Sequence, residues 1–409
     1  MALAVPPGGT LTETLTAGWR AWMTRLKAGD WGALPILAAL VLLAVLFGSL
    51  EENFLTERNF VNLLLQMAGV TAIATGVVFV LLIAEIDLSV AFVSGVGAVV
   101  MTLLLRPDAS DWPWWAAVLA GLVVTTAIGL LHGLIITKAN VPSFVVTLAG
   151  LLAWSGVVLI LTTEASTSGT IRIQDDVVRG IANDFLPNWA GWALLASALG
   201  AYLLLELLKG SRRRSRGLAH QPLVILGVRV LAMAVVGALA VAYANEDRGV
   251  PVVAVIVAAF LVFWTFVATR TRFGRHVYAV GGNPEAARRA GISVDRIRIA
   301  VFMIAGFMAG VGGIILASRL RSVDTGTGGG QLLLQSIAAA VIGGTSLFGG
   351  HGRVISALLG AAVIVTVSNG MDLLNLASGV KFVITGGVLL AAVLIDAFAK
   401  RARAASGAA

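Results

Sequence analysis

Two acidic residues interrupt one of the most apolar parts of the chain. Glu85 and Asp87 lie in the stretch 85–89, which has apolar sequence on both sides. Because an ionisable group at membrane depth is costly, such a residue is by default a candidate for function. These carboxylates can accept hydrogen bonds from substrate hydroxyl groups, or from backbone N–H groups that hold a broken helix rigid. The alternative is a solvated helix end at which Asp87 or Ser89 caps the next helix.

A second interruption is rich in glycine. Residues 343–352 hold five glycines among ten residues, together with Thr345, Ser346 and His351. Such a run does not continue a stable helix, and irregular backbone at membrane depth is tolerated only against protein or a water-filled cavity. It therefore predicts a kink beside a pathway. Ser346 and His351 are five residues apart with no third group to orient them, so nucleophilic catalysis is not indicated.

A third candidate is the basic, polar segment 269–298, which separates two long apolar runs. Within it, Asn283, Pro284 and Glu285 predict the start of a short helix, because Asn caps, Pro fits the first helical position and Glu favours the positive helix end. Gly291 supplies a stop. If a short capped helix between two membrane spans is displaced, both spans are expected to move with it. The alternative is an ordinary surface helix in a loop.

The composition places these segments in a membrane. The chain of 409 residues is 58% hydrophobic and 12% charged, whereas soluble domains carry roughly 25% charge. Its apolar runs of about 18 to 25 residues match the length that a helix needs to cross roughly 30 Å of hydrocarbon. The sequence predicts an all-α, polytopic transmembrane helix bundle of about 10 to 12 hydrophobic segments, of which the glycine-rich ones are broken or re-entrant.

The distribution of Arg and Lys predicts the orientation. When the loops are assigned alternately to the two sides, the basic residues concentrate on the side of both termini, which the positive-inside rule makes cytoplasmic. The net charge of +8 therefore reflects topology and does not indicate nucleic acid. The expected organisation is a cytoplasmic segment 1–31, a transmembrane domain 32–398 with an external loop 162–188 and cytoplasmic loops 209–221 and 269–298, and a cytoplasmic tail 399–409. The spacing of apolar residues in 1–31 favours an interfacial amphipathic helix, with a disordered basic tail as the alternative.

Several kinds of chemistry have no support in the sequence. There is no Cys, so thiol chemistry and thiolate metal sites are excluded. The four His residues show no metal-ligand spacing. The chain also lacks a G-x-x-x-x-G-K-[ST] motif, so we do not expect it to hydrolyse ATP by the usual P-loop machinery.

The segment 281–292, GGNPEAARRAGI, resembles the coupling loop of permease subunits in ATP-binding-cassette importers, and in particular the carbohydrate branch with the ribose, arabinose and xylose permeases. Three more stretches resemble that family: IDLSV at 86–90, VPSF at 141–144 and IGGTSL at 342–347. The resemblance covers most of the chain from about residue 59 to 401. The length, the extra central spans and NGM at 369–371 favour the xylose-type branch. The chain departs from the family with Glu85 in place of a usual Gly, and with Ala91-Phe92 in place of Gly-Ser.

The resemblance implies roles for two sets of residues. The set that contacts a separate ATPase is Gly282, Asn283, Pro284, Glu285, Ala286, Ala287, Arg288, Arg289 and Gly291. The set that lines the pathway is Asp87, Ser89, Ser143, Phe144, Thr147, Thr345, Ser346 and Asn369, to which the acidic position of Glu85 adds a further candidate. The implied partners are a second permease copy, an ATPase subunit that holds ATP and Mg, and an external sugar-binding protein.

The prediction is a multi-pass protein of the bacterial inner membrane, in contact with lipid, that carries a monosaccharide such as xylose. It is expected to be a transport subunit rather than an enzyme, with no cofactor of its own. The alternative is an ion-coupled secondary transporter, which would need a central ion relay that only Glu85 and Asp87 could supply. A membrane-embedded hydrolase lacks a convincing set of residues.

Overall fold

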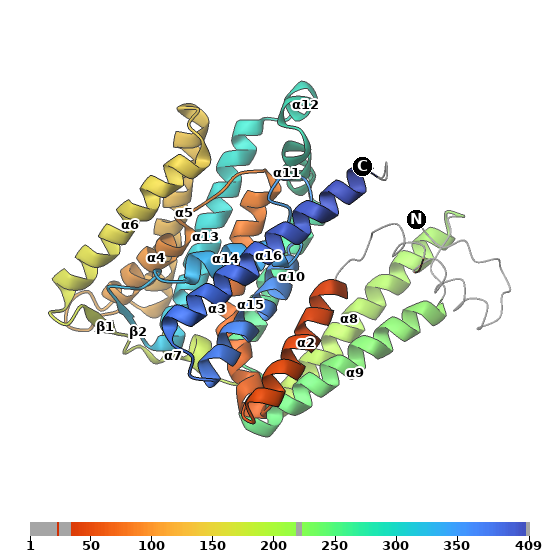
Figure 1. Ribbon diagram of the computed structural model, residues 1–409, viewed down its shortest axis with the longest axis horizontal. Helices are drawn as coiled ribbons and strands as arrows, with labels where there is room; N and C mark the ends of the chain where they lie inside the picture. Colours follow the sequence, from red (N-terminus) through yellow and green to blue (C-terminus); the bar gives the residue numbers. More distant parts are fainter. Residues whose placement is uncertain (1–22, 24–33, 218–222, 406–409) are drawn as a thin grey trace. The chain divides into compact units, whose positions relative to one another are not determined.

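The computed structural model describes Met23 and residues 34–217 and 223–405, and it is almost entirely helical (Figure 1). Eight of the described helices are long and apolar enough to cross a membrane, and four shorter apolar helices accompany them. The predicted all-α membrane bundle is therefore confirmed. The predicted interfacial helix in 1–31 lies outside the described residues, apart from Met23. The predicted tail begins inside the last helix, which is described as far as Ala405.

The chain forms two units. The first contains α8 (Asn188–Arg214) and α9 (Leu223–Asp247). The second consists of residues 36–184 and 251–400 and contains nearly all the other described elements. These are α2 (Leu34–Leu50), α3 (Glu57–Leu82), α4 (Val90–Leu104), α5 (Trp114–Lys138), α6 (Ser143–Ala165), β1 (Thr170–Arg172), α7 (Asp176–Asn183), α10 (Val252–Arg270), α11 (Arg272–Gly282), α12 (Pro284–Arg289), α13 (Val294–Leu320), β2 (Ser322–Asp324), α14 (Leu332–Ile342), α15 (Ser356–Leu373) and α16 (Ser378–Ala405).

The first unit is a helical hairpin. Its base is closed by a hydrogen bond from the Leu186 N–H to the Val250 carbonyl at 2.9 Å, and α8 packs against α9. Only 6% of the most apolar window of each helix is buried. Such uniformly exposed, apolar helices suit a hydrocarbon solvent rather than water.

Proline sets the start of several helices. Pro113, Pro142, Pro187 and Pro251 directly precede α5, α6, α8 and α10, with φ between −55° and −62°. Proline has this φ by virtue of its ring, and it lacks an N–H that a helix start would leave unpaired. These residues therefore separate apolar runs into distinct helices.

Helix α13 is the axis of the second unit and packs against α3, α4 and α5. Glycines allow these backbones to approach closely. A Cβ added at Gly129 of α5 would lie 2.2 Å from the Phe302 carbonyl oxygen, and one at Gly313 would lie 2.0 Å from that of Ser94. Close backbone packing at small residues is the usual way in which membrane helices associate. The polar segment that precedes α13 is thus attached to a helix that packs against three others of this unit.

The two ends of the second unit carry different structures (Figure 1). At one end α12 projects from the bundle. At the other end β1 and β2 form a short antiparallel ribbon in which Ile171 pairs with Val323. Helix α7 lies beside this ribbon, and the predicted external loop 162–188 contains both α7 and β1.

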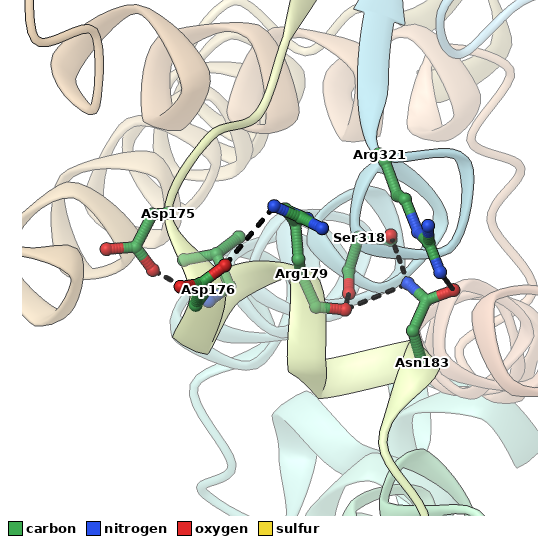
Figure 2. A network of polar contacts seen from close by, with 7 residues as sticks. Asp175, Asp176, Arg179, Asn183, Ser318 and Arg321 are labelled. Carbon is green, nitrogen blue, oxygen red and sulfur yellow. Dashed lines mark hydrogen bonds and ion pairs between the residues drawn. The ribbon is translucent and has the colours of Figure 1, made fainter.

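Figure 2 shows how α7 is fastened to the end of α13. The Ser318 hydroxyl accepts a hydrogen bond from the Ala182 N–H at 2.9 Å and donates to the Arg179 carbonyl at 3.1 Å. The Asn183 amide donates to the Ser318 carbonyl at 2.7 Å. Asp175 caps the start of α7 by accepting from the Val178 N–H at 2.8 Å. These bonds give the loop a fixed structure at this end of the bundle.

Candidate functional site

Helix α12 has the boundaries that its residues predict. The Asn283 side chain accepts a hydrogen bond from the Ala286 N–H at 2.9 Å, and Pro284 is the first helical residue. Gly291 ends the segment with φ of +81°, a conformation that glycine adopts without strain. The predicted cap and stop are therefore confirmed, and α12 has a defined start and end.

The surface of α12 is charged. Glu285 forms ion pairs with Arg288 at 3.1 Å and with Arg289 at 3.5 Å, while Ala287 is buried underneath. The Arg289 side chain remains 80% exposed. Exposed ion pairs of this kind contribute little to stability, so they leave the guanidinium groups available to a partner.

The first break, residues 83–89, separates α3 from α4. Ala84 has φ of +60°, which turns the chain out of α3. The Asp87 carboxylate then accepts hydrogen bonds from the Ser89 N–H at 2.9 Å and the Ser89 hydroxyl at 2.7 Å. Ser89 is the residue before α4, yet its side chain makes no capping bond. Asp87 therefore holds the turn into α4 through its side chain.

A buried chain of hydrogen bonds extends from this turn. The Ser89 hydroxyl lies 3.3 Å from His132 Nδ1, and the Trp154 indole N–H donates to His132 Nε2 at 3.1 Å. An indole N–H can only donate, so Nε2 accepts and Nδ1 of a neutral ring carries the proton. The bonds then run in one direction, from Trp154 through His132 and Ser89 to Asp87. The last three residues are each less than 10% exposed.

His132 is absent from the residues that the sequence singles out. A signal was present, since a titratable residue within an otherwise apolar span is a functional candidate. In the structure His132 and Trp154 line a groove of about 500 Å³ between α5 and α6. The other lining residues are Leu131, Ile135, Val145, Val146, Ala149, Gly150 and Ala153.

The start of α6 holds the backbone of the first break. The Ile86 N–H donates to the Ser143 hydroxyl at 3.2 Å, and the Thr147 hydroxyl lies 3.3 Å from the Ile86 carbonyl. Thr147 also donates to the Ser143 carbonyl at 2.9 Å. Phe144, between them, has a half-exposed side chain. The structure thus brings Ser143 and Thr147 together with Asp87 and Ser89 at one break.

Glu85 is paired rather than free. Its Oε1 lies 3.0 Å from Nε of Arg298 in the second turn of α13, and the two side chains are only 14% and 24% exposed. The contact is an ion pair without the alignment of a hydrogen bond. It joins the first break to the helix that directly follows the α12 segment.

The glycine loop, residues 343–352, contains two further predicted pathway residues, Thr345 and Ser346. Ser346 accepts from the Phe348 N–H at 3.2 Å, and its own N–H donates to the His351 carbonyl at 2.9 Å. Thr345 is buried, and within the described part of the chain its hydroxyl has no hydrogen-bond partner. The Gly350 N–H donates to the Leu82 carbonyl at 2.9 Å, so the glycine loop contacts the end of α3.

Tyr278 of α11 makes a second hydrogen bond to the glycine loop, in addition to the bond between Gly350 and Leu82. Its hydroxyl donates to the Gly352 carbonyl at 2.8 Å. Burial raises the pKa of Tyr278 above its ordinary value, while the charge of Arg353 opposes that rise. The phenol therefore remains a hydrogen-bond donor over a wide pH range.

Asn369 lies apart from the other candidates. Its side-chain amide and that of Asn59 form a reciprocal pair, with N···O distances of 2.9 and 3.0 Å. Asn59 is at the start of α3, whereas the first break is at its end, a separation of about 35 Å along a helix that rises about 1.5 Å per residue. The structure thus separates Asn369 from the group around Asp87.

A polar hollow of about 350 Å³ lies at the β1 end of the second unit. Its lining includes Arg106, Asp108, Arg172 and Gln174. Arg106 pairs with Asp108 and donates to the Ala165 carbonyl at 2.8 Å. The hydrogen bond from the neighbouring Arg106 guanidinium lowers the pKa of the Asp108 carboxyl and so favours its ionised, paired form.

Comparison with known proteins gives the context of these features. Residues 59–394 match the family model described as the permease component of the branched-chain amino acid transport system. The chain belongs to this permease family. It is 35% identical over 381 residues to the xylose transport system permease protein of Escherichia coli K12, which covers 92% of this chain and 94% of the relative. The corresponding xylose permease protein of Haemophilus influenzae is 33% identical over 388 residues and covers 93% of this chain and 100% of the relative.

A more distant relative is the ribose import permease protein of Escherichia coli K12, at 29% identity over 377 residues, or 92% of this chain and 95% of the relative. No solved structure matches the chain. Membership of the permease family and the long apolar helices make this chain a multi-pass transport subunit of the bacterial inner membrane and not an enzyme. The resemblance to sugar permeases seen in the sequence is confirmed.

Proposed function

We propose that this chain is the permease subunit of an ATP-driven sugar importer and that it forms the pathway for a monosaccharide, xylose or a similar pentose. The family and the names of the relatives support the proposal, since these relatives are named for xylose and ribose transport. The family model names branched-chain amino acids instead. The relatives match nearly the whole chain and carry more weight for the substrate.

The observation that carries the proposal is the structure around α12. The helix is capped and projects from one end of the second unit (Figure 1). The side chains of Arg288 and Arg289 are 57% and 80% exposed. Its start and end are set by the Asn283 cap and by Gly291, and short connections join it to α11 and α13. A partner protein that displaced α12 would therefore also displace the adjoining helices α11 and α13. We assign this role to a separate ATPase subunit that binds ATP and Mg.

In this proposal α12 and both termini face the cytoplasm, as the distribution of basic residues predicts. The ribbon of β1 and β2, with α7, then faces outward and receives sugar from an external binding protein. A second copy of this chain completes the pathway, and the exposed apolar helices contact lipid. No nucleic acid and no cofactor on this chain are involved.

The candidate pathway residues form two groups: those whose polar atoms are hydrogen-bonded within the protein, and those with a group left available to a sugar. Asp87, Ser143 and Thr147 make hydrogen bonds within the protein, so they shape the first break. Thr345 has a buried hydroxyl with no hydrogen-bond partner among the described residues, and Phe144 offers a half-exposed ring. Few free polar groups suit a pathway that passes a sugar without holding it, because the external protein can supply selectivity.

The test is co-purification with the ATPase subunit. Replacing both Arg288 and Arg289 with Glu reverses the charge of α12 and should release the ATPase. Arg296→Glu reverses one charge in the same way at an exposed position of α13, and this variant should retain the ATPase. Unchanged retention by the double variant would argue against the docking surface. Uptake driven by an ion gradient, without any ATPase, would contradict the proposed function and favour ion-coupled transport.

A further inference from the structure

The two breaks meet at one place, next to the helix that leads into α12. The Gly350 N–H of the glycine loop donates to the Leu82 carbonyl, the last residue of α3, at 2.9 Å. This carbonyl is one of those that a helix end leaves without an internal partner. The bond therefore joins the glycine loop to the first break through the main chain alone.

Gly281 of α11 packs closely against both residues that form this hydrogen bond. A Cβ added there would lie 1.7 Å from the Leu82 carbonyl oxygen and 2.7 Å from the Gly350 nitrogen. From the other side, a Cβ at Gly349 would lie 2.7 Å from the Gly281 carbonyl oxygen and 2.8 Å from the Ala84 Cβ. All these neighbours except the Ala84 methyl are backbone atoms, which cannot move aside as a flexible side chain can. We call Leu82, Gly281, Gly349 and Gly350 the glycine contact.

The helices on either side of α12 in the chain, α11 and α13, both make contacts at the first break. Before α12, helix α11 contacts Leu82, the residue directly before the first break, through Gly281, and it binds the glycine loop through the Tyr278 hydroxyl at 2.8 Å. After α12, helix α13 reaches it through the ion pair between Arg298 and Glu85 at 3.0 Å. A displacement of α12 thus acts on the first break from two sides and on the glycine loop from one.

We propose that the glycine contact is the mechanical link that carries movement of α12 to both breaks, and that Gly281 is its positioning residue. The inference rests on the proposed function. Backbone atoms in direct contact transmit a displacement without the slack that side-chain rotamers allow. A methyl group at Gly281 would separate α11 from Leu82 and Gly350 while leaving the exposed surface of α12 intact. The ATPase would then bind and hydrolyse ATP without moving the breaks.

The experiment uses the absence of Cys from the chain. A single Ile86→Cys substitution places a thiol in the first break, where the native side chain is 40% exposed. The full permease with its ATPase, in lipid nanodiscs, is labelled with a maleimide in the absence and presence of ATP and vanadate. With Gly281 present we expect the labelling rate to change by at least about fivefold, a typical allosteric coupling. With Gly281→Ala we expect retention of the ATPase but a change of less than about twofold.

Two further variants serve as controls for the effect of Gly281→Ala. Gly200→Ala adds the same methyl group to a helix of the first unit, where no atom of the described residues lies within 4 Å, and should behave as the parent does. Ala279→Ser changes α11 at an exposed position outside the set assigned to the ATPase, so the loss there should be smaller than at Gly281. Equal losses at Gly281 and Ala279 would overturn the inference, because the effect would then belong to α11 and not to the contact.

The remaining outcomes are also decisive. A full ATP-dependent change in the Gly281→Ala protein would overturn the inference, as would the lack of any change with Gly281 present. If Gly281→Ala is not produced, Tyr278→Phe removes only one hydroxyl from the same link and should reduce the change, whereas an undiminished response would overturn the inference. Failure of the parent permease to retain the ATPase would instead contradict the proposed function.

Discussion

Glu85 and Arg298 form an ion pair, 3.0 Å between Oε1 and Nε, that ties the first break to α13. The pair is largely covered, at 14% and 24% exposure of the two side chains. Covered charges are stable only when each retains its partner. Glu85, which stands where the related sugar permeases usually have Gly, is therefore paired with Arg298 in this chain. This ion pair stabilises the first break.

Removing one partner should destabilise the protein more than removing both. Arg298→Gln leaves the Glu85 carboxylate without its cation and should lower the free energy of unfolding by about 1 to 3 kcal/mol. The double variant with Glu85→Gln should recover part of this loss. The measurement is the thermal unfolding midpoint in detergent, analysed as a double-mutant cycle.

An exposed ion pair provides the control for that cycle. Arg179 and Asp176 lie 3.2 Å apart with the Asp side chain 93% exposed (Figure 2). Asp176→Asn should change stability by less than about 1 kcal/mol, as is usual for surface pairs. Additive effects of Glu85→Gln and Arg298→Gln would mean that their pair contributes nothing to the fold.

The buried chain around His132 makes a spectroscopic prediction. Because the Trp154 N–H donates to Nε2, the neutral His132 ring should carry its proton on Nδ1. Nitrogen-15 NMR of histidine-labelled protein should show this tautomer, with the signal assigned by its loss in His132→Asn. Trp154→Phe should shift the population toward the Nε2–H form, whereas Trp192→Phe in α8 should leave it unchanged. An Nε2–H tautomer in the native protein would contradict the hydrogen-bond direction assigned here.

The Asn59–Asn369 pair makes a prediction about a residue assigned to the pathway. Asn369→Ala leaves the buried amide of Asn59 with an unpaired donor and acceptor, which should cost about 1 to 3 kcal/mol of stability. Adding Asn59→Ala should restore part of it. Thermal unfolding and sugar uptake are measured on the same preparations. Loss of uptake at unchanged stability would instead support a direct role of Asn369 in the pathway.

What the sequence predicts well is local. The start and stop of α12 depend on Asn283, Pro284 and Gly291, which lie within nine residues of each other and act through backbone geometry. The membrane spans follow likewise from hydropathy, and the proline that precedes a helix marks its beginning. Here the physical cause lies inside the segment, so the sequence alone suffices.

What it does not predict are partners that are distant in the chain. Asn369 bonds to a residue 310 positions away, and the cation of Glu85 lies on α13. Such contacts depend on which helices pack together, which in a membrane is decided by small-residue surfaces rather than by a local pattern. Glycines such as Gly281 look alike in the sequence, although only some meet another backbone.

Tyr278 provides a prediction that depends on pH. Burial raises the pKa of its phenol in the folded protein, whereas the unfolded chain has the ordinary value. The associated stability is therefore fully present below the unfolded pKa and is lost as the pH rises through the folded pKa. Absorbance titration should show one of the three Tyr residues ionising late, and Tyr278→Phe should remove that step. The same variant should unfold with a shallower loss of stability at alkaline pH, and an unaltered titration would show that the hydroxyl bound to the Gly352 carbonyl is not the late group.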